Sequence, residues 1–148
     1  MNGVLPAVAR RHLRYGWLGL ALFVGMGLVL EGLHAVKAPV YLDVGSETRR
    51  LMWTLAHAHG TLLSLVQLSA AATAVMVGPG VVSALASRLL LSGLVLLPLG
   101  FFLGGVVTYG GDPGPGVFLA PVGALTTLVG VGSVAASVWK ATGAGTSE

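Results

Sequence analysis

The sequence contains no cysteine and little charge. The absence of cysteine excludes disulfides, thiolate metal sites and covalent attachment of haem. Charged residues make up 9% of the 148 residues, whereas soluble domains contain about 25%. Because so few charges cannot cover a surface that faces water, we expect most of the surface to face lipid. The length suits a single domain, residues 1–148.

Basic residues are also scarce. Eight Lys and Arg against five Asp and Glu give a net charge of +3. This number is too small to neutralise a track of phosphates, so nucleic acid is not expected as a partner. The basic residues instead follow the pattern of a membrane topology, and we expect the lipid bilayer as the main environment.

Long apolar segments are the most prominent feature of the sequence. Four of them occupy about residues 15–36, 51–77, 81–107 and 117–139. Each can cross about 30 Å of hydrocarbon as a helix that rises 1.5 Å per residue. The sequence therefore predicts an all-α integral membrane four-helix bundle. Gly78-Pro79-Gly80 predicts a tight antiparallel turn between the second and third helices, and residues 141–148 are expected to form a disordered tail.

The basic residues predict the orientation in the membrane. The inner side would carry Arg10, Arg11, Arg14, Arg88 and Lys140, and the outer side Lys37, Arg49 and Arg50. This five-to-three bias predicts that both termini lie in the cytoplasm. The first apolar segment is longer than the core of a signal peptide, and Pro39 disfavours cleavage after it. We expect a multi-pass protein of a bacterial inner membrane.

Small residues recur inside the apolar segments. The third segment contains Gly100-x-x-x-Gly104, and the second contains Ala70, Ala71, Ala72 and Ala74. Small residues let the backbones of membrane helices approach closely. We therefore predict that Gly100 and Gly104 lie at a contact between helices.

Two ionisable residues, Glu31 and His34, lie at the outer end of the first segment. A spacing of three places both on one face of a helix. Glu-x-x-His is also the ligand pair of di-iron helix bundles, which makes Glu31 and His34 a candidate metal site. The alternative is a hydrogen bond between the two side chains at the membrane interface.

His57 and His59 lie about two turns into the second segment. Two residues on a helix are about 200° apart, so the rings point to different faces and cannot bind one metal ion together. Gly60 leaves room beside them for a flat group or for a neighbouring helix. Each imidazole either serves a site or bonds a carbonyl or hydroxyl of a neighbouring helix, and the sequence leaves both possibilities open.

A cofactor site near the outer leaflet would use His57 and His59, with His34 as a further candidate ligand. If the first two helices are neighbours, Glu31 and His34 could converge with them. The stripe of His57 continues through Thr61 and Ser64, which could line a polar pocket. His12 lies in the basic N-terminal flank, where we expect it to be solvated. Catalytic residues are not identified by the sequence.

Two families share features with these segments. Residues 55–65, Leu-Ala-His-Ala-His-Gly-Thr-Leu-Leu-Ser-Leu, resemble a histidine helix of haem–copper oxidase subunit I-like proteins, which implies ligation of haem b. The chain is also similar in length and helix count to the hydroxylaminobenzene mutase-like group. It shares with that group a His-x-x-Gly at His57–Gly60 and a Gly/Pro-rich connection at residues 110–121. This second resemblance implies a membrane isomerase.

Three functions follow as hypotheses. The chain could be a small accessory or structural subunit that docks other membrane subunits, or copies of itself, through glycine-rich faces. It could be a b-type haem or metal-binding redox protein that uses His57 or His59. It could also be an isomerase without a cofactor, in which a histidine acts as acid and base. We favour the first, because it requires no special chemistry.

Overall fold

The computed structural model describes residues 5–143 and consists almost entirely of helices. The long helices are α1 (Ala7–Ala35), α3 (Glu47–Met76), α4 (Ala84–Val106) and α5 (Leu119–Gly143). All four are long and apolar enough to cross a membrane. The prediction of an all-α protein with four such helices is confirmed.

Three of the four long helices extend beyond the predicted apolar segments at one end, whereas α4 (Ala84–Val106) lies within its segment. Helix α1 begins at Ala7 rather than at residue 15, α3 begins at Glu47 rather than at residue 51, and α5 ends at Gly143 rather than at residue 139. Hydropathy marks the part of a helix that suits lipid, whereas the hydrogen-bonded helix can continue into polar residues. Residues 141–143 of the predicted tail are helical, and residues 144–148 lie outside the described part of the chain.

All three connections between the long helices contain short helices. The link between α1 and α3 contains α2 (Pro39–Leu42) and the 3₁₀ helix η1 (Val44–Ser46). The link between α3 and α4 contains η2 (Pro79–Val81), which follows Gly78 at a φ of 129°. Such a φ is accessible to glycine because it lacks a Cβ. The predicted tight antiparallel turn is confirmed.

The link between α4 and α5 contains a small hairpin. Strand β1 (Thr108–Tyr109) pairs antiparallel with β2 (Asp112–Pro113), and η3 (Pro115–Phe118) leads into α5. Gly110 and Gly111 form the turn with φ values of 57° and 97°. Positive φ at both central residues is the geometry of a tight hairpin turn, which explains the paired glycines.

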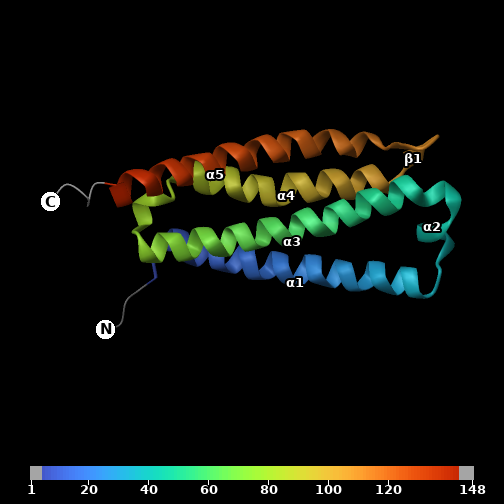
Figure 1. Ribbon diagram of the computed structural model, residues 1–148, viewed down its shortest axis with the longest axis horizontal. Coiled ribbons are helices and arrows are strands. Elements are labelled where there is room, and N and C mark those ends of the chain that lie inside the picture. Colours follow the sequence, from blue (N-terminus) through green and yellow to red (C-terminus); the bar gives the residue numbers. More distant parts are fainter. Residues whose placement is uncertain (1–4, 144–148) are drawn as a thin grey trace.

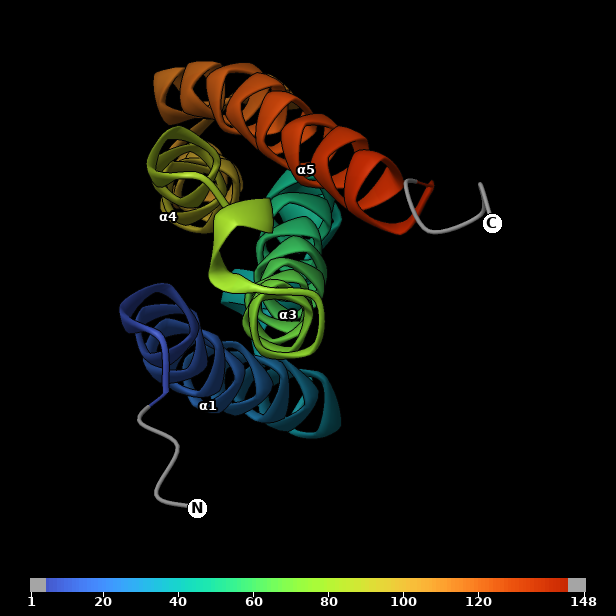
Figure 2. The same ribbon diagram turned by 90° about the vertical axis from the view of Figure 1, so that its left-hand side faces the viewer.

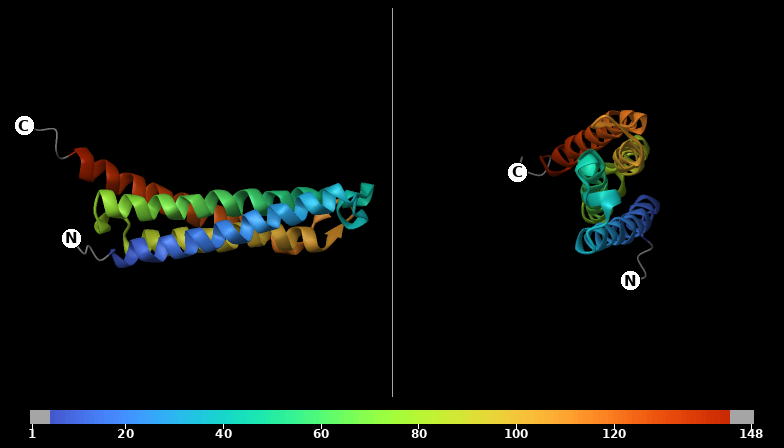
Figure 3. Two further views of the ribbon diagram at one scale, coloured as in Figure 1. Left: turned by 90° about the horizontal axis from the view of Figure 1, so that it is seen from below. Right: turned by 90° about the vertical axis from the view of Figure 1, so that its right-hand side faces the viewer.

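The four long helices lie side by side and alternate in direction (Figure 1). The start of α1 and the end of α5 lie at one end, which we call the terminal end, and α2 and the hairpin lie at the other, the loop end. Helix α1 packs mainly on α3, α3 also packs on α4, and α4 packs on α5. The end views in Figures 2 and 3 show α1 and α5 on opposite sides of this arrangement. The bundle is therefore open, and its two outer helices expose most of their surface.

Glycines of α4 form its contacts with η3 and α5. A Cβ added at Gly100 would collide with the backbone nitrogen of Ala120, and one added at Gly104 would lie 3.1 Å from Cβ of Val117. The prediction that Gly100 and Gly104 lie at a helix contact is confirmed. Of the four alanines singled out near the end of α3, three are likewise buried: Ala70, Ala71 and Ala74.

Candidate functional site

A buried polar network joins α1, α3 and α4 near the terminal end. Nδ1 of His12 lies 2.6 Å from Oε1 of Gln67, and its Nε2 lies 2.9 Å from Oγ of Ser87. Nε2 of Gln67 donates in turn to the carbonyl of Leu90 at 3.0 Å. His12 and Gln67 have no exposed surface. The expectation that His12 is solvated is wrong, because α1 begins early enough to place this residue inside the bundle.

The partners determine where the protons of this network lie. The carbonyl of Leu90 can only accept, so the amide nitrogen of Gln67 faces it and Oε1 faces His12. Nδ1 of His12 then carries a proton and donates to Oε1. Nε2 of the neutral ring accepts the hydroxyl proton of Ser87. Every hydrogen bond in the network is thus matched with a neutral imidazole.

One signal in the sequence could have pointed to this network. Gln67 lies in the middle of an apolar helix, and an amide there needs a polar partner. The partner of this amide is His12, which lies 55 positions earlier in the chain. Because the two residues are far apart in the sequence, their pairing could be identified only from the packing of α1 on α3.

His57 extends from α3 toward α1. Its Nδ1 lies 2.7 Å from the backbone carbonyl of Phe23, and its ring lies against Gly27. Because a carbonyl can only accept, Nδ1 carries the proton and Nε2 remains the basic atom. The ring is half-buried.

His59 points in another direction. Its Nδ1 donates to the carbonyl of Leu55, one turn back on α3, at 2.9 Å. Its ring faces Phe101 of α4, with the ring centroids 4.9 Å apart. The prediction that the two histidines face different helices is confirmed. The space beside Gly60 is filled by the ring of Phe23 from α1, so of the two predicted occupants it is the neighbouring helix that takes this space.

Both α3 histidines have an orientation that suits a ligand. In proteins, an imidazole that binds a metal usually donates its other N–H to a carbonyl or carboxylate. Nδ1 of His57 and Nδ1 of His59 each make such a bond. Nε2 of either ring is therefore the atom that could bind haem iron or a metal ion.

The hydroxyl stripe beside His57 is engaged in helix packing. Ser64 is buried, donates to the carbonyl of Gly60 at 2.7 Å, and faces Gly19 of α1. Oγ1 of Thr61 is buried and has no partner among the described residues. At Ser64 the stripe lines a contact between helices and not a polar pocket.

Glu31 and His34 lie exposed in the last two turns of α1. Within residues 5–143, no three His, Cys, Asp or Glu side chains gather into a group that could hold a metal ion. The sequence had suggested that Glu31 and His34 could converge with His57 and His59. The four side chains do not form one cluster. His34 lines a shallow cavity at the loop end with Lys37 and Asp43. A metal site at Glu31 and His34 alone stays a prediction.

Arg49 and Trp53, near the start of α3, hold the end of α4. Arg49 donates to the carbonyl of Gly105 at 3.0 Å and to that of Val106 at 3.5 Å. Nε1 of Trp53 donates to the carbonyl of Phe102 at 3.2 Å, and its ring stacks on the ring of Phe102. The last carbonyls of a helix lack partners within the helix and carry partial negative charge, so a guanidinium there is favourable.

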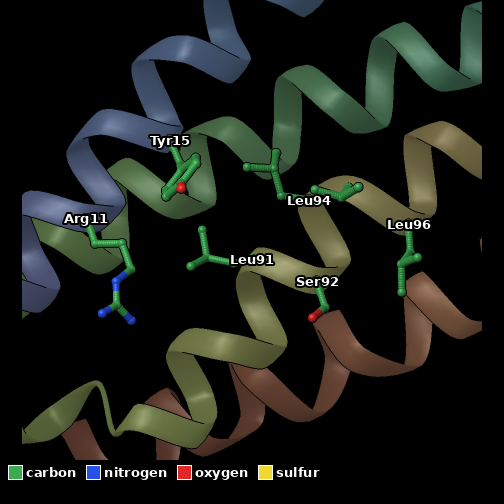
Figure 4. A pocket seen from close by; sticks show the side chains of 7 residues that line it. Arg11, Tyr15, Leu91, Ser92, Leu94 and Leu96 are labelled. Atoms are coloured by element: carbon green, nitrogen blue, oxygen red, sulfur yellow. The ribbon is translucent and has the colours of Figure 1, made fainter.

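A groove separates α1 from α4 near the terminal end (Figure 4). Its volume is about 590 Å³. Arg11 and Tyr15 of α1 line one side, and the other side is lined by Leu91, Ser92, Leu94, Val95 and Leu96 of α4. A second hollow begins at Arg11 and Tyr15 and runs over Arg10 and Arg14. Arginines therefore lie at one end of an otherwise mostly apolar groove.

No protein-family model, no curated protein and no solved structure matches this chain. The resemblances to haem–copper oxidase subunit I-like proteins and to the hydroxylaminobenzene mutase-like group rest on sequence features alone and stay predictions. Any functional conclusion must therefore come from the residues and their geometry.

Proposed function

We propose that this chain is a multi-pass protein of a bacterial inner membrane and a small structural or accessory subunit of a membrane complex. In this proposal a helix of another subunit, or of a second copy, packs on the side of α1 that faces away from α3. The observation that carries the proposal is the position of Gly25 and Gly32 on that side.

The glycines of α1 fall into two groups. A Cβ added at Gly16, Gly19 or Gly27 would meet a side chain of α3. A Cβ added at Gly25 or Gly32 would meet nothing within 4 Å. A spacing of seven residues places Gly25 and Gly32 on one stripe of the helix. The first group accounts for the packing on α3, and the second has no role within the chain.

Exposed glycines in a membrane helix need a reason. Glycine in a helix is less favourable than alanine by about 1 kcal/mol, and lipid would accept alanine at either position. A second helix supplies the reason, because glycine lets its backbone approach more closely than any residue with a side chain does. The stripe of Gly25 and Gly32 is thus suited to docking a transmembrane helix.

The double substitution Gly25→Leu with Gly32→Leu tests the proposal. We expect the parent chain, extracted from its own membrane in mild detergent, to run on a native gel in an assembly larger than the chain alone. The double variant should lose this assembly while it keeps the helical circular dichroism spectrum of the parent. Ala124→Leu, which adds similar bulk to an exposed position of α5, is the control and should keep the assembly. A parent that runs as a single chain, or a double variant that keeps the assembly, would contradict the proposal.

A b-type haem or metal function is the second candidate. One observation favours it: Nδ1 of His57 and of His59 both donate to carbonyls, as orienting bonds of ligand imidazoles do. The absorption spectrum of the purified protein separates the two candidates. A haem band that disappears in His57→Leu would favour the second.

A further inference from the structure

We propose that the groove between α1 and α4 binds one anionic phospholipid. Its phosphate would lie among Arg10, Arg11 and Arg14, and an acyl chain would lie along Leu91 and Leu94. The inference requires that the chain is inserted in a membrane, but it is independent of the docking stripe on α1.

The site combines two adjacent hollows. Arg11 and Tyr15 line both the groove and the hollow over the other two arginines, so a single molecule can occupy the two together. Figure 4 shows Arg11 and Tyr15 extending from α1 toward the side of Leu91 on α4. A charged headgroup and an apolar chain would each meet matching side chains.

The distribution of charge favours an anion at this end. Arg10, Arg11 and Arg14 lie in the first turns of α1, and Arg88 lies near the start of α4. The carboxylates of residues 5–143 all lie toward the loop end, in Glu31, Asp43, Glu47 and Asp112. The three arginines of α1 therefore have no carboxylate of the described chain at their own end. A lipid phosphate can supply the missing negative charge.

The distance from Arg11 to the far end of the groove is close to the depth of one leaflet. The contact of His12 with Ser87 places Arg11 at the level of Ser87 along α4. From Ser87 to Leu96 the helix rises roughly 13 Å, at 1.5 Å per residue. Half of the hydrocarbon thickness is about 15 Å. A chain that starts at the arginines would thus reach the middle of the bilayer at the far end of the groove.

The buried network keeps this groove in place. His12 lies between Arg11 and Tyr15 in sequence, but its ring faces inward and bonds to Gln67 and Ser87. These bonds fix α1 against α3 and α4. Arg11 and Tyr15 are consequently held on the groove side of α1. The site is thus preorganised for the lipid.

Native mass spectrometry of the full chain in detergent tests the site, with equal amounts of phosphatidylglycerol and phosphatidylcholine added. We expect the anionic lipid to remain bound and the zwitterionic lipid to be lost. Each of Arg10→Gln, Arg11→Gln and Arg14→Gln should weaken retention of phosphatidylglycerol about fivefold, the effect of one basic residue at an anionic membrane surface. Arg50→Gln removes an arginine from the loop end and should change nothing.

Two further arms separate a seated lipid from simpler explanations. Leu91→Trp should reduce retention of phosphatidylglycerol by filling the groove, with the arginines intact. Glycerol phosphate, the headgroup without acyl chains, should not bind at the same concentration. Equal retention of both lipids, retention unchanged by the arginine variants or by Leu91→Trp, or equal binding of glycerol phosphate would each overturn the proposal.

Discussion

Three polar side chains inside the bundle, His12, Gln67 and Ser87, form hydrogen bonds that lipid could not provide. Each hydrogen bond in this network joins a donor to an acceptor. Hydrogen bonds between membrane helices contribute on average only about 0.6 kcal/mol. Leaving a buried polar group without a partner costs more, about 1–3 kcal/mol. Removing one partner is therefore expected to lower the free energy of unfolding by more than the hydrogen bond itself contributes.

His12→Leu is expected to destabilise the protein by about 1–3 kcal/mol, because Oε1 of Gln67 loses its donor in a site that water does not reach. The double variant His12→Leu with Gln67→Leu should recover part of this loss, since it removes the unpaired amide as well. Thermal unfolding in detergent, followed by circular dichroism, measures both.

Val24→Ala is the control for this comparison, because Val24 is exposed on the same helix and lies outside both the network and the proposed lipid site. It should leave the unfolding temperature unchanged. A His12→Leu variant as stable as the parent would show that His12 is solvated after all.

Local sequence predicts the directions of some histidine side chains but not the residues that they contact. The opposite directions of His57 and His59 follow from their spacing on one helix, so they could be predicted. The neighbours of His57 could not, because Phe23 and Gly27 come from another helix. His12 was misjudged because its neighbours in sequence are arginines, whereas its neighbours in space are Gln67 and Ser87.

In the contact between α4 and α5, glycines of each helix lie against the backbone of the other. Gly93 faces Thr127, Gly123 faces the backbone of Leu97, and Gly100 faces the backbone of Ala120. A backbone cannot move aside as a flexible side chain can. The glycine spacing in α4 predicted a contact, but which helix would fill it depended on the fold.

Gly100→Ile should separate α4 from α5 and lower the unfolding temperature in detergent, because its Cβ would collide with the backbone of Ala120. The expected loss is at least the 1–3 kcal/mol typical of overpacked cores. Gly132→Ile, where an added Cβ meets nothing within 4 Å, is the matched control and should have little effect. Equal unfolding temperatures for the two variants would mean that α4 and α5 do not pack as described.

The positions of the helices could be predicted from the sequence, but their exact ends could not. Apolar runs located all four long helices, since lipid requires a continuous apolar segment. Their ends were misplaced by several residues, because helix ends depend on capping and on neighbours. Ser83 caps α4 by accepting from the N–H of Ala86, and Arg49 holds the opposite end of α4. These contacts involve loops whose positions the sequence pattern does not determine.

At the scale of the whole molecule, charge is distributed unequally between the two ends. The terminal end carries Arg10, Arg11, Arg14, Arg88 and Lys140 and none of the described carboxylates. At the loop end, Arg49 donates to carbonyls of α4 and lies 5.8 Å from the ring centroid of Trp53, so part of its charge is engaged within the protein. Free positive charge is therefore concentrated at the terminal end.

The excess of positive charge should keep the terminal end in the cytoplasm during insertion, so we expect both termini inside. The lack of cysteine allows a direct measurement, because a single introduced cysteine is the only thiol that can react. Gly45→Cys lies at the loop end, where an added side chain meets nothing within 4 Å, and Ala7→Cys lies exposed at the terminal end. In intact spheroplasts, a membrane-impermeant maleimide should label Gly45→Cys and leave Ala7→Cys unlabelled, and lysis should make both reactive. Labelling of Ala7→Cys but not of Gly45→Cys before lysis would reverse the assigned orientation.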